Sequence, residues 1–187
     1  MSRSLISLLF LVITVSWMAE FILFRNRGTS EGEMQERRSY PFLLFVIALT
    51  ISMAVLMREW NIFYVGSTLV HAAGIVLYAS GVLLRYWGIF HLKEQFTRHV
   101  SFRQGDALVS SGPYRRLRHP LYTGLLLIII GICLSLGNAV LAGAGGTAAA
   151  LGLLKRIRIE EKMLIEAYGE EYRSWAEKRY RLVPPIY

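Results

Sequence analysis

The chain has 187 residues, of which 54% are hydrophobic and only 18% are charged. A soluble domain typically has about 25% charged residues, and here the charges gather in short basic stretches between long apolar runs. The formal net charge of +8 therefore indicates anionic lipid and membrane orientation rather than nucleic acid. The single cysteine, Cys133, lies in an apolar run and excludes an internal disulfide, so we interpret it as a packing residue.

Five apolar segments are expected to form transmembrane helices. In chain order they are residues 5–24, 41–57, 65–90, 120–136 and 139–154. The first is too long for the apolar core of a signal peptide, and we interpret it as a retained span. The last two have about 16 residues each, against the roughly 20 that cross a bilayer. They form either a re-entrant hairpin or a pair whose second helix continues into 155–168, which contains no helix breaker. We favour the continuous helix.

The basic residues predict how the chain is oriented. If the five spans alternate, the loop 25–40, the loop 91–119 and the tail 155–187 lie on one side of the membrane. These three segments hold 18 of the 21 Lys and Arg residues. The positive-inside rule therefore places them in the cytoplasm and the N-terminus outside.

The first group of residues that could carry chemistry lies in segment 108–124. Gly112-Pro113 signals a turn, and His119 stands directly before a helix opened by Pro120. The first turn of a helix has free N–H groups and a partial positive charge, which suit a carboxylate or a phosphate. A membrane-entry segment with snorkelling arginines and interfacial tyrosines explains the same residues without a ligand.

The second group lies in the tail. Arg156 and Glu160 are four residues apart, so they share one face of a helix, which Leu164 and Tyr168 extend. An ordinary surface helix with i,i+4 pairs is the alternative interpretation. Because the segment follows an apolar span on the same predicted side as the first group, we expect the two groups to lie together.

Residues 143–148 match the weak dinucleotide fingerprint G-x-G-x-x-A. That motif requires a preceding strand, whereas this segment lies within an apolar helix, where small residues usually permit close packing. No zinc-ligand spacing or phosphate-binding loop is apparent in the sequence. We therefore expect no metal, and because the basic residues flank apolar runs we expect no nucleic acid as a partner.

Both groups of residues resemble the isoprenylcysteine carboxyl methyltransferase family of membrane enzymes. In the first group the matching residues are Leu108, Val109, Gly112, Tyr114 and the run Arg118-His119-Pro120-x-Tyr122. In the tail they are Arg156, Glu160-Glu161, Tyr168-Gly169-Glu170-Glu171-Tyr172 and Pro184. The resemblance covers roughly residues 90–187, including 96–100 ahead of the loop. The first three spans match only in hydropathy.

The resemblance implies an all-α integral membrane bundle of about five helices, with a cytoplasmic pocket formed by the loop 91–119 and the C-terminal helix. It implies one domain, 1–187, with three spans in 1–90 and a catalytic core in 91–187. The implied methyl donor is S-adenosylmethionine, bound without a Rossmann domain. The implied cofactor contacts are His99, Asp106, Ala107, Leu108, Val109, Tyr114, His119, Pro120, Leu121, Tyr122 and Glu160. Arg156 would bind the carboxylate of the methyl acceptor and, with Glu160, form the catalytic pair.

The implied acceptor is a lipidic or prenylated molecule, most directly an isoprenylcysteine-like carboxylate at the cytoplasmic face of a prokaryotic inner membrane. A carboxylate is already ionised near neutral pH, since its unperturbed pKa is roughly 3.5–4. The site needs no general base and must instead align two reactants and remove water. Related membrane methyltransferases act on phospholipid amines or thiols, which would need a base that the sequence does not reveal.

Two other classes of protein stay open from the sequence. Membrane sterol reductases that use NADPH have a similar Arg-His-Pro-x-Tyr element and a similar ending, here Pro185-Ile186-Tyr187, in chains about twice as long. A non-enzymatic membrane protein would be expected to place polar residues deep in its spans. Glu20, His71 and Arg85 are the candidates for such residues.

Overall fold

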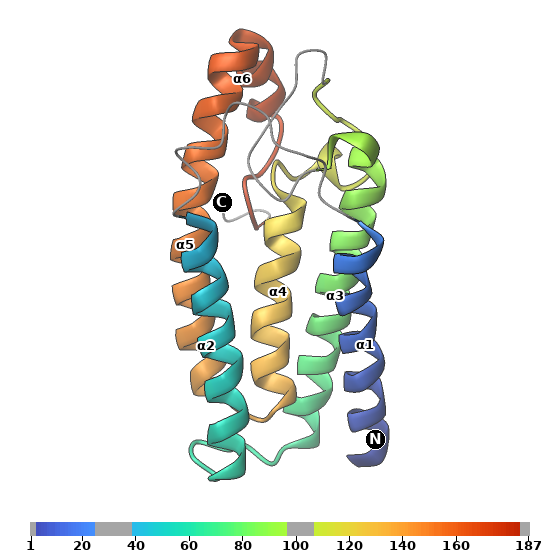
Figure 1. The fold of residues 1–187 in the computed structure, drawn as a ribbon, viewed down its shortest axis with the longest axis vertical. Helices are drawn as coiled ribbons and strands as arrows, with labels where there is room; N and C mark the ends of the chain where they lie inside the picture. The colour runs from blue at the N-terminus through green and yellow to red at the C-terminus, as the bar shows by residue number, and fades with distance from the viewer. Residues whose placement is uncertain (1–2, 25–38, 97–106, 184–187) are drawn as a thin grey trace.

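The computed structural model describes residues 3–24, 39–96 and 107–183. Within these ranges the chain forms long helices that run side by side along one axis (Figure 1). They are α1 (Arg3–Leu23), α2 (Ser39–Glu59), α3 (Thr68–Leu92), α4 (Pro120–Ser135) and α5 (Ala139–Tyr168), followed by the short α6 (Glu170–Glu177). Two 3₁₀ turns, η1 (Lys93–Gln95) and η2 (Gly112–Arg115), lie between α3 and α4.

The all-helical membrane bundle predicted from the sequence is confirmed. Among the described residues, Ser4–Leu23, Thr68–Leu92 and Ala139–Tyr168 are long and apolar enough to cross a membrane, and α4 is a shorter apolar helix of 16 residues. Large apolar side chains are exposed on the surface of the bundle, for example Ile22 at 81% and Leu69 at 78%. An apolar surface of this kind is stable in lipid. Lipid also favours helices, because it cannot hydrogen-bond to the backbone and a helix satisfies its own N–H and C=O groups.

Helix α5 continues through the charged segment, as the sequence predicts. It has 30 residues, which corresponds to about 45 Å at the α-helical rise. Because roughly 20 residues cross the apolar part of a bilayer, the last third of α5 reaches the end of the bundle that also holds α6 (Figure 1). Glu160 lies in that last third, and Arg156 lies one turn before it. The helix ends at Gly169, whose φ of +55° favours glycine.

The opposite end of the bundle is tied together by two turns. The backbone N–H of Val65 donates to the Gly137 carbonyl at 2.7 Å. The side chain of Asn138 donates to the Ile62 carbonyl at 3.2 Å and accepts from the N–H of Leu141 at 2.8 Å, which caps α5. Val65 therefore belongs to this turn rather than to the third span, where the sequence analysis placed it.

Helices α3 and α4 approach so closely that glycines line their contact. The glycines recur every seven residues, at Gly74, Gly81 and Gly88 on α3 and at Gly124 and Gly131 on α4. A Cβ on Gly81 would lie 2.6 Å from the Gly124 carbonyl oxygen, and one on Gly131 would lie 2.4 Å from the Tyr78 backbone nitrogen. Backbone atoms cannot give way as side chains can, so this contact requires glycine. The seven-residue spacing was missed in the sequence analysis.

The segment that matches a dinucleotide fingerprint lies inside α5 and serves packing. A Cβ on Gly145 would lie 2.3 Å from the Thr50 side chain of α2, and one on Gly146 would lie 2.9 Å from Ile130 of α4. The small residues thus let α5 approach two neighbouring helices, which confirms the packing interpretation.

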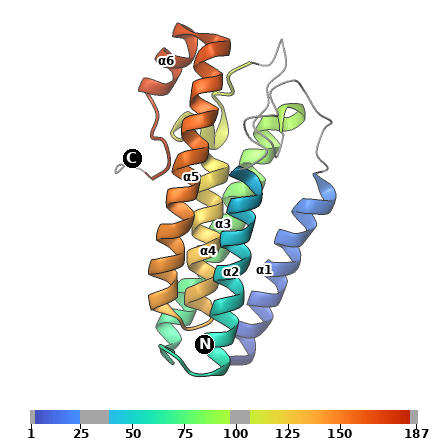
Figure 2. The ribbon, with the colours of Figure 1, turned by 60° about the vertical axis from the view of Figure 1, so that its left-hand side comes forward.

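Helix α1 stands at the edge of the bundle, as Figure 2 shows. It is bound to α3 by polar contacts within the apolar layer. The Tyr78 hydroxyl donates to Thr14 Oγ1 at 3.2 Å, and the Tyr86 hydroxyl donates to the Ser16 carbonyl at 2.7 Å. A third contact joins Glu20 to Arg85.

Candidate active site

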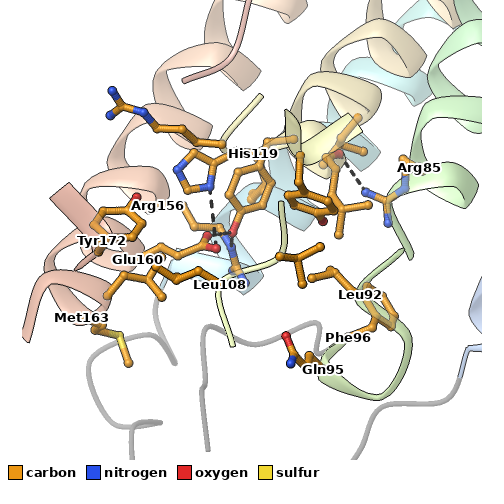
Figure 3. Close-up of a pocket in the computed structure, with 18 of the residues that line it drawn as sticks. Arg85, Leu92, Gln95, Phe96, Leu108, His119, Arg156, Glu160, Met163 and Tyr172 are labelled. Carbon is orange, nitrogen blue, oxygen red and sulfur yellow. Dashed lines mark hydrogen bonds and ion pairs between the residues drawn. The ribbon is translucent and has the colours of Figure 1, made fainter. Parts of the chain in front are cut away.

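A cavity of about 300 Å³ opens at the end of the bundle where α5 leads into α6 (Figure 3). Its apolar wall includes Trp17, Phe21, Leu43, Leu44, Ile47 and Phe96. Its polar wall includes Arg85, Arg118, His119, Tyr122, Arg156 and Glu160. An apolar pocket with a few convergent polar groups is typical of a binding site for a small molecule.

A hydrogen-bonded chain of three side chains lies at the centre of the polar wall. The Arg156 Nε donates to the Tyr122 hydroxyl at 2.7 Å, and that hydroxyl donates to Glu160 Oε2 at 2.7 Å. Arg156 is only 3% exposed. Arg156 and Glu160 reach the same tyrosine because they lie one turn apart on α5. The expectation that the two groups of residues lie together is confirmed.

His119 occupies the N-cap position of α4 and lies beside this chain. Its ring stacks on Tyr122 with centroids 5.6 Å apart. Its Nδ1 and Nε2 atoms lie 3.7 Å from a Glu160 oxygen and 3.5 Å from a Glu161 oxygen. Burial by itself lowers the pKa of His119, but the two carboxylates outweigh burial and raise it to about 9. The imidazole is therefore positively charged at neutral pH.

The raised pKa of His119 predicts how stability depends on pH. Its ordinary pKa is 6.5 and its folded value about 9, so the contribution to stability is fully present below about pH 6.5 and is lost as the pH rises through 9. We expect the unfolding temperature in detergent to fall by several degrees between pH 6.5 and 9. His119→Gln should reduce this decline. An equally steep decline in that variant would contradict the assignment.

A C-terminal strap, residues 179–182, lies against residues 116–123 at the start of α4. The backbone N–H of Arg118 donates to the Tyr180 carbonyl at 2.8 Å, and the Thr123 hydroxyl (Oγ1) donates to the Leu182 carbonyl at 2.5 Å. Glu161, 6% exposed, pairs with Arg118 at 3.0 Å and with Arg181 at 2.9 Å. The strap therefore fixes α5 against the segment that precedes α4.

Helix α6 is attached to the loop in front of η2. Trp175 Nε1 donates to Ser110 Oγ at 2.9 Å, and Arg179 Nε donates to the Tyr114 carbonyl at 2.6 Å. The Arg179 guanidinium also lies 4.3 Å from the centre of the Trp175 ring. Burial, assisted by the charge of Glu160, raises the pKa of the Tyr114 phenol well above its ordinary value, so the phenol remains protonated. Together these contacts close one side of the cavity.

The structure brings most of the predicted site residues to the cavity. Those in its wall are Ala107, Leu108, Val109, Tyr114, His119, Leu121, Tyr122, Arg156 and Glu160. Pro120 is buried as the first residue of α4 and is not among the wall residues. His99 and Asp106 lie outside the described residues, as does Pro184.

Sequence reasoning missed several wall residues. These are Arg85, Gln95, Met163, Tyr172 and Trp175, with the apolar residues of α1 and α2. Opposite charges within two apolar spans were the signal for Arg85, because an ion pair in lipid must face the bundle interior. Within the described residues, no group of three or more His, Cys, Asp or Glu side chains could hold a metal ion.

The fold and the cavity define a helical membrane protein with a ligand pocket at one end of its bundle. The sequence model of the isoprenylcysteine carboxyl methyltransferase (ICMT) family matches residues 72–166, slightly more than half of the chain. The chain therefore belongs to this family. The matched residues include α4 and nearly all of α5, which carry Tyr122, Arg156 and Glu160.

Individual proteins agree with the family assignment. Protein-S-isoprenylcysteine O-methyltransferase A of Arabidopsis thaliana is 30% identical over 113 residues, covering 59% of this chain and 57% of its own length. A probable protein-S-isoprenylcysteine O-methyltransferase of Oryza sativa subsp. indica is 28% identical, with 76% of each chain covered. The solved structure of a eukaryotic intramembrane Ras methyltransferase ICMT has the same fold, with a TM-score of 0.69 and 20% identity over 94% of this chain and 63% of that chain. The chain thus spans less than two thirds of two of these relatives.

Proposed function

We propose that this protein is a methyltransferase that uses S-adenosylmethionine to methylate the carboxylate of an isoprenylcysteine-like lipid. The observation that carries the proposal is the Arg156–Tyr122–Glu160 chain in the wall of a mostly apolar cavity. The Lys and Arg residues of segments 25–40, 91–119 and 155–187 support an active site on the cytoplasmic side of the membrane, and we extend the proposal to a prokaryotic inner membrane.

The cavity suits an adenosyl methyl donor in size and chemistry. S-Adenosylmethionine supplies a methyl group bound to a positively charged sulfonium. The volume of about 300 Å³ falls at the lower end of the range for small-molecule sites, about 300–1,000 Å³. Glu160 is the only carboxylate among the described wall residues, and it provides negative charge for a cationic donor. Residues 107–109 and Tyr114 supply the facing wall.

The same cavity suits an acceptor with a carboxylate head and an apolar tail. Arg156 is buried next to Tyr122, and its planar guanidinium can bind a carboxylate through two parallel hydrogen bonds. Leu43, Leu44 and Ile47 of α2 line the wall beside it with apolar side chains. Such a site removes water from the carboxylate and aligns it for in-line attack on the methyl group.

A carboxylate is favoured over a thiol or an amine as the acceptor. A thiol or an ammonium must lose a proton before it can attack, so those acceptors need a base. Glu160 already accepts a hydrogen bond from Tyr122 and lies beside the charged His119, so it is poorly suited to take up a proton. A carboxylate acceptor needs no base.

Calorimetric titration of detergent-purified protein tests the donor. We expect saturable binding of S-adenosylmethionine and S-adenosylhomocysteine and none of NADPH, and a loss of at least about 10-fold in affinity for Glu160→Ala. Radiolabelled methyl transfer to S-farnesylcysteine, phosphatidylethanolamine and a small thiol then identifies the acceptor. Binding of NADPH alone would contradict the proposal and indicate an NADPH-dependent reductase. Methylation of only the amine or the thiol would overturn the carboxylate assignment.

A further inference from the structure

An ion pair on the far side of the cavity joins α1 to the site. Arg85 Nε donates to Glu20 Oε2 at 2.8 Å, and Arg85 Nη2 contacts Oε1 of the same carboxylate. Glu20 is fully buried on α1, and Arg85 comes from α3 and lines the cavity. Figure 3 shows Arg85 across the cavity from Glu160 and His119. Arg85 and Glu20 thus meet in a bidentate pair, the geometry that fixes a guanidinium most firmly.

Arg85 makes one more bond, to the backbone of α4. Its Nη1 donates to the Leu121 carbonyl at 3.1 Å, and Leu121 lies between His119 and Tyr122 in the first turn of that helix. Glycine at position 124 leaves room for the Arg85 side chain, because a Cβ there would lie 2.6 Å from Arg85 Cγ. Glu20, Arg85 and the first turn of α4 are therefore one connected unit.

Stability is a poor explanation for this pair. Removing two charges from water costs free energy that their attraction often fails to recover, and apolar side chains of similar volume commonly serve as well. Within membrane spans, ionisable residues are rare and usually mark functional sites. The family match begins at residue 72, so it includes Arg85 but not Glu20.

We propose that Glu20 and Arg85 are positioning residues that hold the first turn of α4 in place for methyl transfer. This inference rests on the proposed function. Arg85 fixes the Leu121 carbonyl, Leu121 is adjacent to Tyr122, and the Tyr122 hydroxyl must lie 2.7 Å from both Arg156 and Glu160. Displacement of a reactant by about 1 Å can reduce a rate 100-fold. Glu20 keeps the guanidinium aimed at that carbonyl.

Exchange of the two charges separates positioning from simple pairing. The double variant Glu20→Arg with Arg85→Glu can re-form an ion pair between α1 and α3, but the new carboxylate has no hydrogen to donate to Leu121. We expect its unfolding temperature to recover to within a few degrees of wild type, relative to Glu20→Gln alone. Its kcat should stay at least about 10-fold below wild type, with the KM for the donor within about 3-fold. Recovery of kcat together with stability would overturn the proposal.

Hydrogen exchange gives a readout that does not depend on activity. Amide exchange in residues 119–125 should be about 10-fold faster in the double variant and in Arg85→Lys, whose single ammonium cannot serve both Glu20 and Leu121 from one position. Gly143→Ala, on an open face of α5, is the control that should match wild type.

If the double variant does not fold, unchanged exchange and kcat in Arg85→Lys overturn the proposal. If wild-type protein neither binds the donor nor transfers methyl groups, the proposed function fails, and the exchange data still decide whether the pair positions α4.

Discussion

Replacing Arg156 with lysine is expected to reduce methyl-transfer turnover about 100-fold while the affinity for S-adenosylhomocysteine changes less than about 3-fold. Lysine keeps the positive charge but has one ammonium in place of the planar fork, so it cannot fix both oxygens of a carboxylate. It also lacks the Nε that donates to the Tyr122 hydroxyl at 2.7 Å. Steady-state kinetics with S-farnesylcysteine, beside calorimetry with S-adenosylhomocysteine, measure the two effects.

The matched control for Arg156→Lys is Tyr122→Phe. That variant removes the hydroxyl between Arg156 and Glu160 but leaves both charged groups in the cavity, so we expect a smaller loss of about 10-fold. If Arg156→Lys kept wild-type turnover and wild-type KM for the acceptor, Arg156 would not be the group that binds the carboxylate. If donor binding failed instead, Arg156 would belong to the donor site.

Gly131→Val is expected to lower the free energy of unfolding by about 3 kcal/mol, enough to remove most folded protein from a detergent extract. A Cβ at this position would lie 2.4 Å from the Tyr78 nitrogen and 2.8 Å from the Gly74 carbonyl oxygen. Neither atom can move without separating α3 from α4. The yield of monodisperse protein and its thermal unfolding in detergent measure the effect.

Gly143→Ala serves as the control for Gly131→Val, because nothing lies within 4 Å of a Cβ at Gly143. Alanine favours the helix over glycine by up to about 1 kcal/mol, so this variant should unfold at the same temperature as wild type or slightly above. Equal stability of Gly131→Val and wild type would show that α3 and α4 can separate without cost.

The sequence was sufficient to predict the helices, because lipid requires each span to satisfy its own backbone. Span limits were correct to within a few residues except at Val65, whose backbone bonds to Gly137 in a turn. The continuity of α5 followed from the lack of a breaker after Leu154. The shared face of Arg156 and Glu160 followed from their spacing, and the structure adds that Tyr122 joins them.

What the sequence did not reveal depends on how the helices are rotated and on contacts between distant segments. Hydropathy does not tell which face of α3 meets α4, so the repeated glycines passed unnoticed. Glu20 and Arg85 are 65 positions apart, and only the packing of α1 on α3 brings them together. The strap binds the start of α4 through the backbone carbonyls of Tyr180 and Leu182. Because every residue has such a carbonyl, these contacts produce no recognisable pattern in the sequence.

The strap also determines when the start of α4 can be held in place during synthesis. Tyr180 and Leu182 supply carbonyls to Arg118 and Thr123, about sixty residues earlier in the chain. The spans can enter the membrane one after another as translation proceeds, but the start of α4 gains these two bonds only after residue 182 has left the ribosome. A nascent chain that has not yet reached residue 182 therefore carries a bundle in which the start of α4 is not held by the strap.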